Sequence, residues 1–345
     1  ITLGASSSEN GEGLVYKNQV LASDFCVLAQ DSGYKKLWTR FEGARQSLEP
    51  GLLRVEFCGG TQKLVFSLFE NAIYFDCRNF DCKSASLVLL CSIDLAKKLD
   101  KGHAICATEK VEASKPLASE LLQLTKAFGK KAAYARVLSF KKPCEIYISL
   151  ERSPSAATKA AARLCKEGAF KKTQESVKKA LSKSSFKSGS VDYDKALDWA
   201  KFSSLNFLNK NKSRALWAGL PWFRDYWGRD IFTSVPGSLL FSGGIKEAQI
   251  LFENFAELQD SNPRSVTYGR LPNISRGSGD TVYNTADASL LFVRELFETA
   301  CFSGDKSFLK KLWPKVYLAL ECDRNIRTDS SGFLLHGDAD TWMEI

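Results

Sequence analysis

The sequence predicts a multidomain β + α protein, with an N-terminal antiparallel β-sandwich followed by the first part of an α/α toroid. Apolar residues recur with a period of two from about residue 15 to residue 150, and at spacings of three and four after about residue 191. The first period is typical of strands and the second of helices. We therefore predict a β-sandwich domain over 1–150, a basic helical linker over 151–190 and an incomplete helical domain over 191–345.

The alternation is clearest at 53–57, 64–68, 87–93 and 146–150, where the apolar side chains of each run share one face. Gly, Asn and Asp residues in the intervening turns favour an antiparallel sandwich. A helical insertion is expected at 116–128. No segment of this half has a chemical signature, so we expect it to support the site.

Three helices are predicted next: one at 194–208, one that Gly244 opens, and one that precedes Asp305. Their apolar faces are expected to consist of Ile245, Ala248, Phe252 and Phe255 in the second helix and of Leu290, Val293, Phe297 and Ala300 in the third. Asp305 is expected to cap the following helix, and Pro314 to begin or kink it. Helices that alternate with long polar loops favour a toroid, in which the loops at one end build a pocket.

Composition limits the class of protein. With 345 residues, of which 44% are hydrophobic, the chain can bury a large core. No apolar run approaches the roughly 18 residues of a membrane span, so we expect no membrane partner. The chain starts at Ile1 with neither an initiator Met nor a signal pattern, so we expect a processed or truncated N-terminus.

The net charge of +9 is concentrated in the predicted linker. Between Ser155 and Ser190, nine Lys or Arg face two Glu, which leaves +7 in this stretch. A solvated helix face is the usual meaning, and an anionic partner is the alternative. Nucleic acid is disfavoured, because the stretch has few aromatic residues to stack on bases.

The cysteines indicate a reducing compartment. Ten cysteines lie mostly in apolar segments without a C-x-x-C pair, and only two histidines accompany them. This pattern argues against a zinc site, and we expect no metal and no cofactor. Buried free thiols favour the cytoplasm, with a disulfide between Cys77 and Cys82 as an alternative.

The stretch 218–232 has the chemistry of a sugar site. Its sequence, AGLPWFRDYWGRDIF, combines aromatic side chains with two Arg-Asp pairs. Flat aromatic faces cover a pyranose ring, while Arg and Asp donate to and accept from its hydroxyls. The alternative is a loop with ordinary core aromatics and a structural ion pair.

The same stretch resembles a known family. PWF at 221–223 and WGRD at 227–230 resemble the substrate-site motif of the glycogen debranching enzyme family, in its amylo-alpha-1,6-glucosidase domain. Three further motifs follow in the order of the family: LPN at 271–273, YNTADAS at 283–289 and TWME at 341–344. The resemblance is clear from Asp194 onward and vague before it.

The resemblance implies an (α/α)6 domain of six helical hairpins behind a sandwich. About 150 residues follow Asp194, enough for roughly five or six helices. We therefore expect the chain to be a fragment of a longer enzyme, inactive on its own. In the family the catalytic base lies far beyond the motif of the general acid, so we expect it beyond residue 345.

Glu344 is the candidate general acid, since glycoside hydrolysis requires a carboxyl that protonates the leaving oxygen. The neighbouring Trp342 could desolvate Glu344 and raise its pKa. The family has an Asp at the matching position, and the extra methylene of Glu puts efficiency in doubt. Asp338 and Asp340 flank Gly337, and we interpret them as parts of a turn.

The resemblance implies that Arg229 and Asp230 hold the terminal glucose, with charge-assisted hydrogen bonds. Trp222 and Trp227 would stack on the sugar or wall the site. Asn284 and Asp287 are interpreted either as pocket-wall and scaffold groups or as a helix cap. The candidate substrate-binding residues are Trp222, Trp227, Arg229, Asp230, Asn284, Asp287 and Trp342.

The sequence thus predicts a glycosidase that removes alpha-1,6-linked glucose from branch stubs of glycogen-like glucans, by inversion as the resemblance implies. Its expected partner is a branched alpha-glucan, with no nucleic acid. Two alternatives remain: another toroid glycosidase acting on trehalose or glycan ends, and a carbohydrate-binding module without catalysis. The oligomeric state is not predicted.

Overall fold

The computed structural model forms two compact units, Ile1–Lys179 and Ala180–Ile345. It describes residues 2–4, 13–16, 19–31, 34–37, 45–57, 60–66, 72–80, 84–91, 93–115, 135–149, 151, 153–209, 215–219, 225–276, 280–337 and 340. The expected helical insertion at 116–128 lies outside these residues, and so does Cys82.

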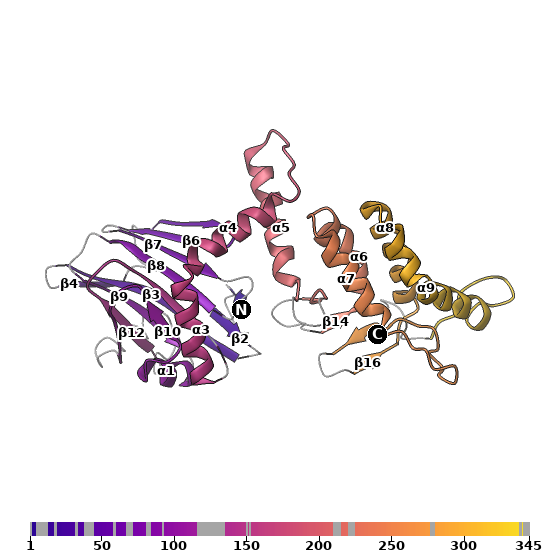
Figure 1. The fold of residues 1–345 in the computed structure, drawn as a ribbon, viewed down its shortest axis with the longest axis horizontal. Coiled ribbons are helices and arrows are strands. Elements are labelled where there is room, and N and C mark those ends of the chain that lie inside the picture. Colours follow the sequence, from indigo (N-terminus) through magenta and orange to yellow (C-terminus); the bar gives the residue numbers. More distant parts are fainter. Residues whose placement is uncertain are drawn as a thin grey trace. The chain divides into compact units, whose positions relative to one another are not determined.

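The first unit contains two antiparallel sheets and helix α1 (Ile93–Asp100) (Figure 1). The strands of the first sheet are β1 (Thr2–Gly4), β2 (Gly13–Tyr16), β3 (Gln19–Asp31), β4 (Tyr34–Leu37), β9 (Ser84–Cys91), β11 (Val111–Ser114) and β12 (Ala135–Phe140). Their order is β1-β2-β3-β9-β12-β11, with β4 paired to β3. The strands of the second sheet are β5 (Arg45–Glu49), β6 (Leu52–Phe57), β7 (Gly60–Phe66), β8 (Ala72–Phe80), β10 (Ile105–Ala107) and β13 (Cys144–Ser149). Their order is β10-β13-β8-β7-β6-β5. The predicted strands are therefore present.

The centre of the second sheet is buried on both faces. Strand β8 pairs with β13 so that Tyr74 lies opposite Tyr147 and Phe75 opposite Ile146. Successive side chains of a strand point to opposite faces, and all four of these residues are at most 1% exposed. The Tyr74 and Tyr147 rings, whose centroids lie 5.3 Å apart, form one face.

The basic stretch forms two helices, α3 (Pro154–Lys166) and α4 (Ala169–Leu181). Leu164 of α3 and Phe170 of α4 pack with the two tyrosines of the sheet. The lysines of α4 lie on the opposite, exposed side, where Lys171 pairs with Glu175. The apolar face of the stretch therefore packs on the second sheet of the first unit, while its charge faces solvent.

The second unit is mainly helical. Its helices are α5 (Val191–Phe207), α6 (Gly228–Val235), the π-helix η1 (Pro236–Leu240), α7 (Ile245–Ala256), α8 (Ala288–Ser303) and α9 (Lys306–Ile326). Phe232 of α6 lies at the centre of the core, with ring centroids 5.8 Å from Phe252, 5.2 Å from Phe255 and 5.5 Å from Phe292. Aromatic burial on this scale fixes α6 against α7 and α8.

Several predicted details of the helices are confirmed. The first helix spans Val191–Phe207, close to the predicted 194–208. Gly244 is the N-cap of α7, whose predicted face buries Ala248, Phe252 and Phe255. Asp305 caps α9, because its carboxylate accepts hydrogen bonds from the backbone N–H groups of Ser307 and Phe308.

One detail of the prediction is wrong, and one alternative is excluded. Leu290 and Phe297, which were expected on the apolar face of α8, are 40% and 37% exposed. The buried face of α8 includes the polar residues Glu295 and Thr299, so the apolar pattern of the sequence did not identify it. Of the two alternatives for Pro314, the start of a helix is excluded, because Pro314 lies inside α9; a kink there stays a prediction. In the part of the chain that the structure describes, no helix has the length and apolarity to cross a bilayer.

Two of the described thiols are buried and free, as expected: Cys144 and Cys322. Burial raises the pKa of Cys144 to about 12. Cys301, by contrast, is an exposed thiol.

The aromatic core can be tested with Phe252→Ala, which removes a fully buried ring. We expect the second unit to lose about 3 to 5 kcal/mol of unfolding free energy, because a cavity remains. Guanidinium unfolding followed by tryptophan fluorescence measures this, since every tryptophan except Trp38 lies in the second unit. Phe333→Ala, at a residue 71% exposed, should change stability by under about 0.5 kcal/mol; equal losses would contradict the assignment.

Candidate active site

Three of the four motifs include or directly adjoin a strand of a small sheet. Its strands are β14 (Tyr226–Trp227), β15 (Ile274–Ser275) and β16 (Thr281–Val282), paired in that order. The Gly228 N–H donates to the Asn273 carbonyl at 2.6 Å, and the Asn273 N–H donates to the Val282 carbonyl at 2.8 Å. Segments up to about 55 residues apart in the sequence are thereby held side by side.

Arg229, in the first turn of α6, joins these segments from within. Its side chain is 6% exposed, and its Nε lies 2.9 Å from Asp287 Oδ2. Its Nη2 donates to Thr285 Oγ1 at 2.9 Å and to the Asp340 carbonyl at 3.4 Å. The Thr285 hydroxyl donates in turn to Asp287. The guanidinium is therefore engaged by the protein itself, as a buried charge requires.

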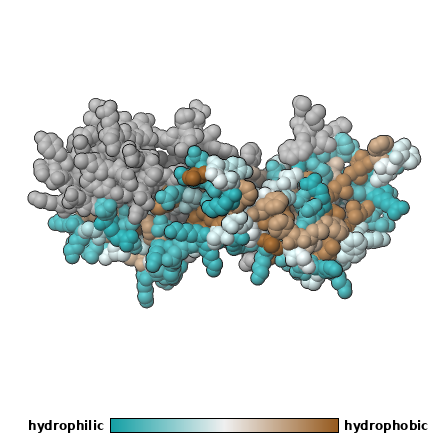
Figure 2. Space-filling model, turned by 90° about the horizontal axis from the view of Figure 1, so that it is seen from above, coloured by the Kyte–Doolittle hydropathy of each residue, from teal (hydrophilic) through white to brown (hydrophobic). Residues whose placement is uncertain are grey.

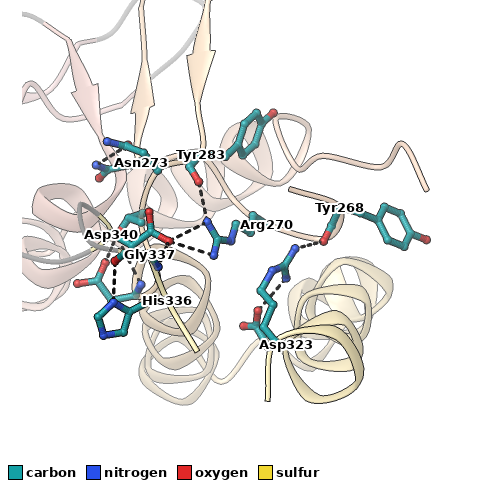
Figure 3. Close-up of polar contacts among 12 residues, drawn as sticks. Tyr268, Arg270, Asn273, Tyr283, Asp323, His336, Gly337 and Asp340 are labelled. Atoms are coloured by element: carbon teal, nitrogen blue, oxygen red, sulfur yellow. Dashed lines mark hydrogen bonds and ion pairs between the residues drawn. The ribbon is translucent and has the colours of Figure 1, made fainter. Parts of the chain in front are cut away.

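Asp340 directly precedes the fourth motif and joins the same network (Figure 3). Its carbonyl accepts a hydrogen bond of 3.0 Å from the Ala286 N–H. Its Oδ2 lies 3.3 Å from Arg270 Nη2 and accepts from the Gly337 N–H at 3.2 Å. The fourth motif thus starts at a residue that is tied to the other segments.

Some of the other candidate residues lie in the part of the chain that the structure describes, and some do not. Trp227, Asp230, Asn284 and Asp287 are all partly exposed around the network. Outside the described residues lie Trp222, Trp342, Glu344 and Asp338. The sugar-binding roles of these residues and the catalytic role of Glu344 therefore stay predictions.

Asn284 contacts the LPN motif, whereas Asp287 contacts Arg229. The Asn284 Oδ1 accepts from Asn273 Nδ2 at 3.2 Å. Asp287 occupies the N-cap position of α8, but its side chain makes no capping hydrogen bond. Its carboxylate binds Arg229 instead, so the alternative of a helix cap does not hold for this side chain.

Asp230 differs from its neighbour Arg229. Its carboxylate is partly buried, and desolvation raises the pKa of the group above its usual range. Among the residues that the structure describes, no other residue donates a hydrogen bond to it. A carboxylate in this state is available to accept hydrogen bonds from the hydroxyls of a ligand.

Arg270 is the residue that the sequence did not indicate. Its Nη1 donates to the Tyr283 carbonyl at 3.0 Å, and its guanidinium pairs with Asp340. A lone arginine before the LPN motif has no local pattern that distinguishes it from a surface residue. Only its position directly before a candidate motif could have drawn attention to it.

Residues 200–345 match the family model of amylo-alpha-1,6-glucosidase. This part of the chain is therefore similar to a glycogen debranching-type glycosidase domain. This match confirms the resemblance over residues 200–345. A comparison with curated proteins found no match.

Close packing between motifs can be tested with Gly228→Ala. An added Cβ would lie 2.5 Å from the Pro272 carbonyl oxygen, so the two motif segments would have to separate. We expect a loss of about 1 to 3 kcal/mol in unfolding free energy. Gly237→Ala is the control, because a Cβ there meets no atom within 4 Å; a similar loss in both variants would contradict the close approach.

The raised pKa of the partly buried Asp230 carboxylate predicts a pH dependence. Because its folded pKa is raised, the cost of its ionised form is present above that pKa and disappears as the pH falls below the unfolded value. Asp230→Asn should therefore stabilise the second unit at pH 7, with a gain that shrinks toward pH 4 in thermal unfolding.

Asp305→Ala is the control of opposite sign. Hydrogen bonds from Ser307 and Phe308 lower the pKa of Asp305, so its stabilisation is present at neutral pH and lost as the pH falls through the folded pKa. Asp305→Ala should destabilise at pH 7. A destabilised Asp230→Asn at pH 7 would show that Asp230 serves the fold.

Proposed function

We propose that residues 200–345 provide the glucose-holding part of a glycosidase that removes alpha-1,6-linked glucose from branch stubs of glycogen-like glucans. The observation that carries the proposal is the convergence of the described motif segments on Arg229, through Asp287, Thr285 and Asp340. Arg229, Thr285 and Asp287 belong to two of the motifs, and Asp340 directly precedes a third. A loop stabilised only by a local ion pair would not require motif segments so far apart in the sequence to meet. The family match supports the same reaction class.

In the proposed site, Asp230 and Asn284 hold the terminal glucose. Asp230 accepts from sugar hydroxyls, because no other described residue donates to its carboxylate. Trp227, partly exposed at the start of α6, covers an apolar face of the ring. Charge-assisted hydrogen bonds of this kind are worth about 1.5 to 3 kcal/mol each.

For the chemistry, Glu344 acts as the general acid that protonates the departing oxygen. In an inverting enzyme the second carboxyl activates water on the opposite face of the sugar, about 6.5 to 9.5 Å away. We assign that base to none of the described carboxylates, since Asp287 and Asp340 are engaged by arginines. The proposed compartment is the cytoplasm. In the proposed architecture, the sheets of the first unit form the sandwich that precedes an (α/α)6 domain.

The test uses the natural protein that carries residues 1–345, incubated with a phosphorylase limit dextrin. We expect release of glucose from this substrate and not from linear maltosaccharides, with the α-linkage giving β-glucose by proton NMR. Binding of the dextrin without glucose release would support a carbohydrate-binding module instead. Activity on trehalose alone would assign another toroid glycosidase.

Two substitutions separate the roles of the carboxyl groups. Asp230→Asn should weaken glucose binding and lower kcat/KM, with part of the effect in KM. Glu344→Gln should leave binding nearly intact and lower kcat by at least about a hundredfold, because an amide cannot protonate the leaving oxygen. Glucosyl fluoride has a leaving group, fluoride, that departs with little help from an acid. This substrate should therefore restore the kcat of Glu344→Gln far more than that of Asp230→Asn. Equal rescue would remove Glu344 as the acid.

A further inference from the structure

The ion pair between Arg270 and Asp340 is shielded from solvent. Their side chains are 13% and 18% exposed, and Oδ2 of Asp340 lies 3.4 Å from Nη1 and 3.3 Å from Nη2 of Arg270. Solvent screens such a pair less than a surface pair, and removal of one partner leaves an uncompensated charge. The pair therefore constrains both residues.

Arg270 is itself held firmly. Its N–H donates to the Thr267 carbonyl at 2.9 Å, and its carbonyl accepts from the Asp260 N–H at 3.0 Å. Its Nη1 donates to the Tyr283 carbonyl, while the Tyr283 hydroxyl donates to the Leu258 carbonyl at 2.7 Å. Contacts other than the ion pair with Asp340 therefore already hold the backbone and the guanidinium of Arg270 in place.

Asp340 is held at both ends. Its carboxylate contacts Arg270 and the Gly337 N–H, while its carbonyl accepts from the Ala286 N–H and Arg229. Contacts on the side chain and on the carbonyl together fix Asp340 itself. Glu344 follows four residues later, so the chain cannot carry it further than about 14 Å from Asp340.

We propose that Arg270 is a positioning residue for catalysis, which fixes the start of the segment that bears the general acid by holding the Asp340 carboxylate. The proposal rests on the proposed function, since it takes Glu344 as the acid. Arg270 does not touch the substrate; it acts through Asp340.

The second unit offers a matched control in Arg327. Arg327 Nη1 binds Asp323 Oδ1 at 2.9 Å, and Nη2 donates to the Tyr268 carbonyl. Arg270 and Arg327 thus each contact one aspartate and one tyrosine carbonyl. The Arg327 and Asp323 side chains are 8% and 10% exposed, yet no described contact joins Arg327 to Asp340. Loss of Arg327 thus removes similar chemistry without the link to Asp340.

Hydrogen exchange tests the link without any need for turnover. In Arg270→Gln, peptides that contain the Ala286 and Gly337 amides should exchange at least about tenfold faster, because both amides donate to Asp340. Arg327→Gln should leave these peptides within about twofold of the parent and affect α9 instead. Equal acceleration in both variants would overturn the proposal.

Kinetics with limit dextrin tests the catalytic consequence. Arg270→Gln should lower kcat at least about tenfold with KM within about twofold, and Arg270→Lys should recover part of the loss. Glucosyl fluoride should restore Arg270→Gln as it restores Glu344→Gln, a response that a merely structural role would not give. Arg327→Gln should retain kcat.

The outcomes separate the two proposals. If the parent protein releases no glucose, the proposed function and the catalytic role of Arg270 are both wrong. Hydrogen exchange then still tests whether Arg270 holds Asp340. Normal turnover by parent and Arg270→Gln alike overturns the positioning role alone. If Arg270→Gln fails to fold, Asp340→Asn removes the same pair from the other side and should give the same exchange pattern and the same loss of kcat.

Discussion

The buried charge of Arg229 is the interaction on which the site depends. A guanidinium removed from water is tolerated only with hydrogen-bonding partners of opposite charge or polarity. Arg229 finds them in Asp287, Thr285 and the Asp340 carbonyl, which belong to segments that the sequence separates widely. Folding must therefore bring these segments together, because the alternative is an uncompensated charge in the interior.

The helical core makes this network possible. The small sheet has strands of only two residues, and so short a sheet is not stable alone. Phe232, on the same helix as Arg229, is fully buried among the aromatic residues of α7 and α8. One face of α6 thus anchors the helix, and its first turn presents Arg229 to the motif segments. The apolar core supplies stability, while the polar network supplies geometry.

Adjacent residues in the first turn of α6 have opposite tasks. Arg229 points inward and is bound by the protein, whereas Asp230 lies about 100° further around the helix and is partly exposed. Desolvation raises the pKa of Asp230 and makes its ionised form costly in the free protein. A group that costs stability and is open to a ligand is typical of a functional site. The family match and this division between neighbours support the same interpretation of the second unit.

The sequence by itself determined the change from strands to helices, the caps Gly244 and Asp305, and the identity of the motif segments, because these signals are local. Only the tertiary structure decided which face of α8 is buried, since Glu295 and Thr299 interrupt its apolar pattern. It also showed that the apolar side of the basic stretch packs on a sheet. The importance of Arg270 could be recognised only from the fold. Its partners Tyr283 and Asp340 lie 13 and 70 residues away, and no periodicity or propensity encodes a contact over that distance.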